Sequence, residues 1–94
     1  MDKESRRRLL DAQVRRGEEA ERVLNNPLVA TAFAAMEADI INTMKRLKPD
    51  EADAMDVCWR ELRALERFRG RFKNYLQTGE LAKKSLMQTI KEKL

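Results

Sequence analysis

The chain has 94 residues, with 20 Lys and Arg against 16 Asp and Glu, one cysteine and no histidine. That length suits one domain, so residues 1–94 are expected to form a single helical domain. Histidine is the commonest general base and metal ligand, and a lone cysteine cannot form an internal disulfide. Ser–His or Cys–His catalysis and most zinc sites are therefore excluded, and we expect no enzyme activity and no cofactor.

Composition favours helices. Charged residues make up 38% of the chain, with only 3 Gly and 2 Pro, which is typical of long helices with solvated faces. The first eight residues are too charged for a secretory signal, and the longest nearly apolar stretch, residues 28–36, is too short to cross a membrane. We expect an all-α cytoplasmic protein with neither a membrane nor a small-molecule partner.

The first expected helix runs from about residue 3 to 24. Its apolar face is narrow and consists of Leu10, Val14, Ala20 and Leu24. Gly17 lies on the same face, where it either admits another backbone closely or weakens the helix. Asn25-Asn26-Pro27 ends this helix and starts the next, because Asn caps helices and Pro suits the first helical position.

The second expected helix, about residues 27–47, is the most apolar. Its apolar side chains recur at spacings of three and four: Val29, Phe33, Met36, Ile40, Met44 and Leu47. A third helix, about 50–77, follows Lys48-Pro49, where the proline moves the preceding residue out of the helical conformation. Because the connection is short, the two helices are expected to form an antiparallel helical hairpin.

A short C-terminal helix, about residues 80–93, completes the predicted fold. Thr78-Gly79 is expected to end the third helix, since glycine commonly follows a helix C-terminus. The apolar residues of the last helix are Leu81, Leu86, Met87 and Ile90. The sequence thus predicts a hairpin extended by a long N-terminal helix and a short C-terminal one, with contacts of the coiled-coil kind.

A basic face on the expected third helix is the most suggestive feature. Spacings of three, four and four place four arginines on one side, with a lysine near them: Arg60, Arg63, Arg67, Arg71 and Lys73. Arginine binds carboxylates and phosphates, so the partner would be an acidic protein surface or a nucleic-acid backbone. A solvated face with local ion pairs explains the pattern equally well, and the sequence leaves these interpretations open.

The cysteine, the aromatic residues and the acidic cluster of the expected third helix each have a structural explanation. Cys58 lies on an apolar face with no histidine to activate it, and is expected to be buried. Trp59 and Tyr75 are expected to be core or interface anchors, so no exposed aromatic for base stacking is predicted. The acidic residues at 50–56 suit a helix N-terminus, whose dipole favours negative charge, and no metal site is predicted.

Charge is distributed unevenly along the chain. The net charge is +3 over residues 1–16, −5 over 17–58 and +6 over 59–94. In such a chain, segments of opposite charge can attract each other within one copy or between neighbouring copies arranged head to tail. This attraction orients the contact more than it adds affinity.

Two stretches resemble small helical proteins that tailed phages and prophages encode, often near packaging and head-assembly genes. They are residues 15–28 followed by Ala32-Phe33, and residues 59–65 with 75–82. The resemblance covers most of the chain and includes no catalytic motif. It implies a role in particle assembly or infection, in the host cytoplasm or within the virion.

The sequence therefore predicts a non-enzymatic interaction protein that docks through its helices to itself or to another virion protein. One alternative is a nucleic-acid-binding accessory module that uses the basic face on phosphates. A second alternative is a phage inhibitor that binds a host protein.

Overall fold

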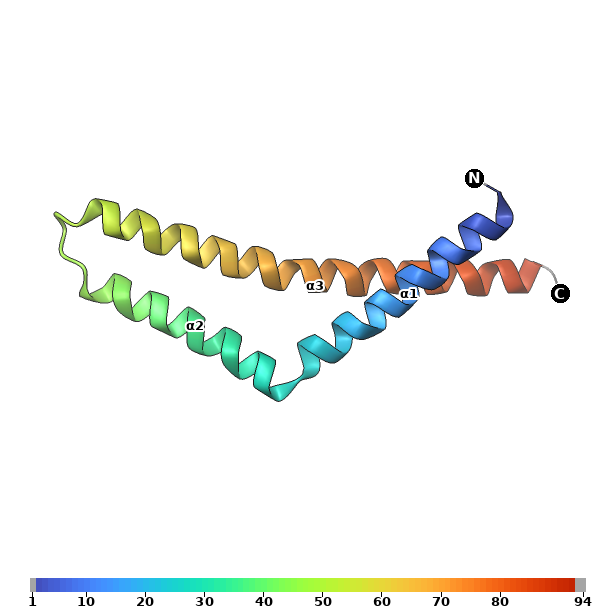
Figure 1. The fold of residues 1–94 in the computed structure, drawn as a ribbon, viewed down its shortest axis with the longest axis horizontal. Helices are drawn as coiled ribbons and strands as arrows, with labels where there is room; N and C mark the ends of the chain where they lie inside the picture. The colour runs from blue at the N-terminus through green and yellow to red at the C-terminus, as the bar shows by residue number, and fades with distance from the viewer. Residues whose placement is uncertain (1, 93–94) are drawn as a thin grey trace. The chain divides into compact units, whose positions relative to one another are not determined.

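The computed structural model describes residues 2–92, which form three helices and no strand (Figure 1). Helix α1 spans Lys3–Asn25, α2 spans Pro27–Arg46 and α3 spans Ala52–Glu92. The all-α prediction is confirmed, and α1 and α2 end within one residue of their predicted ends. The described chain divides into two compact units: a central unit of residues 25–70, and a terminal unit of residues 2–24 and 71–92.

Side-chain caps set the starts of α1 and α2. Asp2 Oδ1 accepts a hydrogen bond from the Ser5 backbone N–H at 2.6 Å, and this bond lowers the pKa of the Asp2 carboxyl. Asn26 Oδ1 accepts from the backbone N–H groups of Leu28 and Val29 at 2.9 and 3.2 Å. Pro27 follows at the first helical position, so the predicted Asn-Pro boundary is the one that the chain uses.

The connection between α2 and α3 is a tight turn before Ala52. Leu47 leaves the helical conformation with φ −72° and ψ 143°. Glu51 Oε2 accepts from the Lys48 backbone N–H at 3.0 Å, and the Glu51 N–H donates to the Lys48 carbonyl at 2.9 Å. The helix therefore starts two residues later than predicted, because Glu51 is used to close the turn.

The central unit contains α2 and the first part of α3 (Figure 1). The Phe33 ring is 8% exposed and lies 5.9 Å from the Phe68 ring. The Arg69 guanidinium covers the Phe33 ring at 5.1 Å. On α3, Cys58 and Leu65 are buried, so the predicted burial of Cys58 is confirmed.

The terminal unit packs α1 against the last part of α3 at a crossing of two glycines. A Cβ built on Gly17 would lie 2.9 Å from the Gly79 Cα and 3.0 Å from the Tyr75 carbonyl oxygen. Ala20 and Ala82, 3% and 2% exposed, lie beside this crossing. Of the two predicted effects of Gly17, close approach of another backbone is the one observed.

Gly79 does not end a helix, so the predicted break after residue 77 is wrong. α3 continues unbroken to Glu92, and the separate helix at 80–93 is replaced by the last turns of α3. In the described part of the chain no glycine has the positive φ of a C-terminal cap. The missing side chain of Gly79 serves packing against Gly17 instead. The end of the predicted helix, Lys93, lies outside the described residues.

The glycine crossing predicts opposite effects for the same substitution at two positions of α3. Gly79→Ala places a Cβ against backbone atoms of α1 and should cost about 1–3 kcal/mol of unfolding free energy. Gly70→Ala meets nothing within 4 Å and should gain up to about 1 kcal/mol from helix propensity. Urea unfolding followed by circular dichroism measures both. Equal effects at the two glycines would contradict the crossing.

The cap at Asn26 predicts a second stability change. Asn26→Ala leaves the N–H groups of Leu28 and Val29 without their acceptor and should cost about 1 kcal/mol. Asn42→Ala, an exposed position inside α2, is the matched control and should cost nothing. The same unfolding measurement compares them, and a cap that carries no stability would leave the two variants indistinguishable.

Candidate functional site

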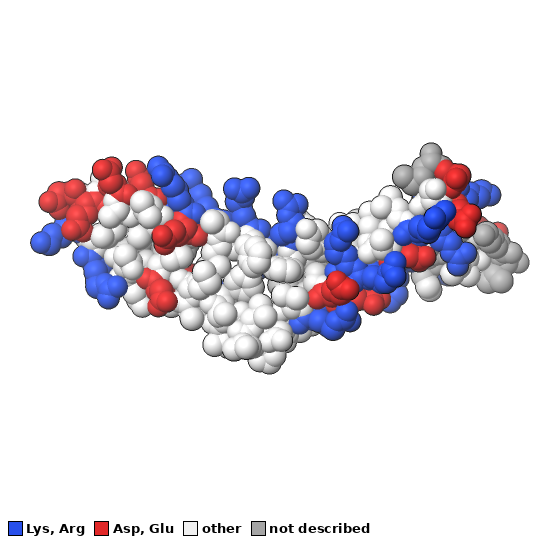
Figure 2. All heavy atoms as spheres, in the orientation of Figure 1, with Lys and Arg blue, Asp and Glu red and all other residues white. Residues whose placement is uncertain are grey.

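All residues of the predicted basic face lie on α3 and are exposed. Arg60, Arg63 and Arg67 belong to the central unit, and Arg71 and Lys73 to the terminal unit. Figure 2 shows Lys and Arg in a row over the central part of α3, after a group of acidic residues near its start. The arginines keep the predicted spacing on an unbroken helix. Lys73, two residues after Arg71, is about 200° round the helix and does not share their side.

The four arginines form no ion pair with any residue between 2 and 92. Asp56 precedes Arg60 by four residues, the spacing at which a helical ion pair forms, yet the pair is not made. The guanidinium groups are available to an anionic partner.

Trp59 is an exposed aromatic residue next to this basic face. Its side chain is 48% exposed and lines a shallow hollow with Asp56, Arg60 and Arg63. The expectation that no aromatic residue would be exposed is therefore wrong, and Phe68 is 59% exposed as well. Trp59 follows buried Cys58 by one residue, which turns it about 100° away from the side that contacts α2.

Exposed apolar side chains are the main feature that sequence reasoning missed. The buried hydrophobic residues of the described chain are Ala20, Phe33, Cys58, Leu65 and Ala82. In the central unit, Leu28 is 76% exposed, Met36 54% and Val57 49%. Much of the surface of α2 in Figure 2 is free of charged residues. Of these three, hydrophobic spacing placed only Met36 on a predicted core face, and it is exposed because a pair of helices covers only the seam between them.

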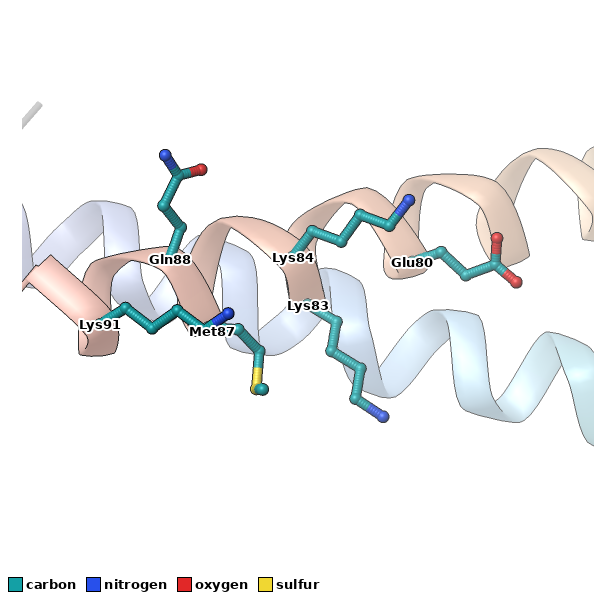
Figure 3. Close-up of a pocket in the computed structure, with 6 residues that line it drawn as sticks. All are labelled: Glu80, Lys83, Lys84, Met87, Gln88 and Lys91. Carbon is teal, nitrogen blue, oxygen red and sulfur yellow. The ribbon is translucent and has the colours of Figure 1, made fainter.

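A second hollow runs along α3 in the terminal unit (Figure 3). It is lined by Glu80, Lys83, Lys84, Met87, Gln88 and Lys91. All of these side chains come from one helix, and Figure 3 shows Lys83 and Met87 leaving α3 on the same side. Met87 is 53% exposed among three lysines. A hollow along a single helix suits a surface contact with a partner better than the enclosure of a small molecule.

The described helices also bear on membrane crossing and on metal binding. No helix within residues 2–92 is both long and apolar enough to cross a membrane. In the same range, no three acidic or cysteine side chains gather in a way that would hold a metal ion. Of the acidic residues at 50–56, Glu51 is hydrogen-bonded in the turn before α3.

No protein-family model, no curated protein and no solved structure matches this chain. The function is therefore inferred from the chain's own residues and surfaces: the exposed apolar side chains, the basic face and the lysine-lined hollow.

Proposed function

We propose that the chain is a non-enzymatic interaction protein of a tailed phage, which docks through its helices to itself or to another protein of the particle. One observation carries this proposal: large apolar side chains are exposed in both units. They are Leu9, Leu28, Met36, Val57, Trp59, Phe68, Leu81, Met87 and Ile90. Burying apolar surface is favourable by about 25 cal/mol per Å², so a partner that covers these side chains gains free energy.

The packing within each unit supports docking as the mode of action. In the central unit only Phe33, Cys58 and Leu65 are buried, which is little for the core of a separately stable domain. Another helical layer laid on α2 and α3 would add the burial that two helices cannot supply. In this proposal α2 and the part of α3 up to Gly70 act as an antiparallel hairpin that presents its uncovered side to a partner.

The chemistry of the side chains supports a role without catalysis. The sequence has no histidine, and its one thiol, Cys58, is 5% exposed. The two hollows described above are open on the surface of α3 and enclose no substrate-sized space. The phage setting rests on the resemblance of residues 15–28 with Ala32-Phe33, and of residues 59–65 with 75–82, to small helical phage proteins. Such a protein would act in the host cytoplasm during assembly or within the virion.

Deleting the gene from its phage genome tests this function. We expect genome replication to continue while the yield of infectious particles falls, because a docking protein acts after replication. Quantitative PCR follows the DNA, and plaque counts with electron microscopy follow the particles. Supplying the unaltered gene from a plasmid is the control.

A normal particle yield would contradict the assembly role. If the chain expressed alone then slowed host growth, the inhibitor alternative would take its place.

The nucleic-acid alternative is favoured by one observation, the position of Trp59 beside two unpaired arginines. An exposed indole stacks on a base, and neighbouring guanidinium groups bind phosphates. Arg60 and Arg63 share the hollow with Trp59, so one nucleotide could contact all three.

Binding of a fluorescent single-stranded oligonucleotide separates the two functions. A nucleic-acid module would bind at about 50 mM salt and lose affinity steeply by about 200 mM. Trp59→Ala would then weaken binding by about 1–3 kcal/mol. The docking proposal predicts no binding even at the lower salt. The variant Lys45→Gln/Lys48→Gln removes the same charge at exposed positions outside the basic face, and it should bind the oligonucleotide better than Arg60→Gln/Arg63→Gln if this module exists.

A further inference from the structure

A further hollow lies along α2 in the central unit. It is lined by Arg69 of α3 and by six residues of α2: Ala34, Glu37, Ala38, Ile41, Asn42 and Lys45. The residues of α2 fall into two rows, and neighbours within a row are four residues apart. Rows of this spacing are the ridges of a helix surface, so the hollow is the groove between two adjacent ridges. We call it the α2 groove.

The two ridges of the α2 groove differ in height and charge. The low ridge consists of exposed residues with short side chains: Ala34, Ala38 and Asn42. On the other ridge, Ile41 is half-buried, and Glu37 and Lys45 lie four residues before and after it. Neither Glu37 nor Lys45 forms an ion pair with any residue between 2 and 92. The low ridge leaves room for a ridge of another helix, and the two charges restrict which helix can enter.

The order of the charges selects the direction of an entering helix. An ionised residue placed in a packed contact costs free energy unless an opposite charge lies against it. A second α2 laid parallel and in register would oppose Glu37 to Glu37 and Lys45 to Lys45. When it is laid antiparallel with Ile41 on Ile41, each Glu37 meets a Lys45, because both lie four residues from Ile41. The α2 groove is therefore complementary to itself in the antiparallel direction.

The two hollows on α3 match the α2 groove less well. The lysine-lined hollow holds three lysines and one carboxylate, so Lys45 laid on it would add to an excess of positive charge. The hollow beside Trp59 holds two arginines and one carboxylate, and it has no small side chain that would make room for a ridge. In the α2 groove the third charged residue is Arg69, whose guanidinium already lies over the Phe33 ring at 5.1 Å.

We propose that a second copy of this chain docks antiparallel on the α2 groove through its own α2. Glu37 of each copy then pairs with Lys45 of the other, and the two Ile41 side chains meet at the centre. The inference rests on the proposed docking function and names a second copy as the partner. Because both copies use the same surface, the contact closes into a dimer and does not propagate into a chain of copies.

Charge exchange across the groove tests the proposal. Sedimentation and light scattering measure the mass in solution over a range of protein concentrations. The unaltered protein should approach twice the 11.0 kDa of a single chain. Glu37→Lys and Lys45→Glu should each weaken the dimer by about tenfold or more, since each opposes like charges at both ends of the contact. Mixing the two variants should restore a dimer, because every lysine then meets a glutamate.

The double variant Glu37→Lys/Lys45→Glu separates this contact from docking of α2 on any other surface of the chain. It should form a dimer with itself, since the exchanged charges still match across the two copies. It should form none with the unaltered chain, because that pair opposes like charges at both ends. Co-purification of an untagged chain with a tagged one measures both outcomes. If α2 docked on a different surface, the double variant would associate less well than either single variant.

Matched controls on α2 separate the pairing from a general effect of charge. Asp39→Lys and Arg46→Glu change an acid to a base and a base to an acid at exposed positions that do not line the groove. Arg46 and Lys45 both lie in the last turn of α2, so their variants disturb the helix dipole alike. Both controls should leave the dimer unchanged. Circular dichroism checks that every variant keeps its helices.

Three results would overturn the proposal: an unaltered protein that stays at the mass of one chain, single variants that form the dimer normally, or a double variant that does not associate with itself. A single-chain mass together with a fall in infectious particles on gene deletion would remove this inference and leave docking to another phage protein standing. A dimer that follows the charge pattern, together with a normal particle yield, would remove the assembly role and leave this inference standing.

Discussion

A layer of two helices can bury only the side chains that face the seam between them, and this constraint governs the whole molecule. In the terminal unit the seam is filled by Gly17, Ala20, Gly79 and Ala82, whose small size lets the backbones touch. Close contact of that kind gains packing but buries little apolar area. Side chains as large as Leu81 and Met87 consequently remain outside. Exposed apolar surface therefore follows from the architecture itself.

The basic face and the buried side of α3 lie on opposite sides of the helix. At about 100° per residue, Arg60, Arg63 and Arg67 are turned about 140–200° away from buried Cys58. Long-range charge of this kind speeds association and orients partners more than it adds affinity. Trp59 beside the arginines is what gives the nucleic-acid alternative its physical basis. Docking would thus use the exposed apolar side chains of α2 and α3, and nucleic-acid binding would use Trp59 and the arginines.

The sequence by itself determined the helical class and most helix ends. Asn26-Pro27 and Pro49 act through local capping and steric effects, so their consequences could be read without knowledge of the fold. The burial of Cys58 also followed from its place on an apolar face. The basic arginines were found in the same way, because spacing on a helix is a local property.

Only the tertiary structure decided the role of Gly79 and the exposure of Trp59 and Phe68. A glycine serves equally well as a helix cap and as a site of close backbone contact, and only the position of Gly17 distinguishes the two. Likewise, hydrophobic spacing shows which side of a helix is apolar but not how much of that side a neighbour covers. The number and size of the neighbouring side chains set that coverage. It is therefore a property of the packed helices and not of any one segment.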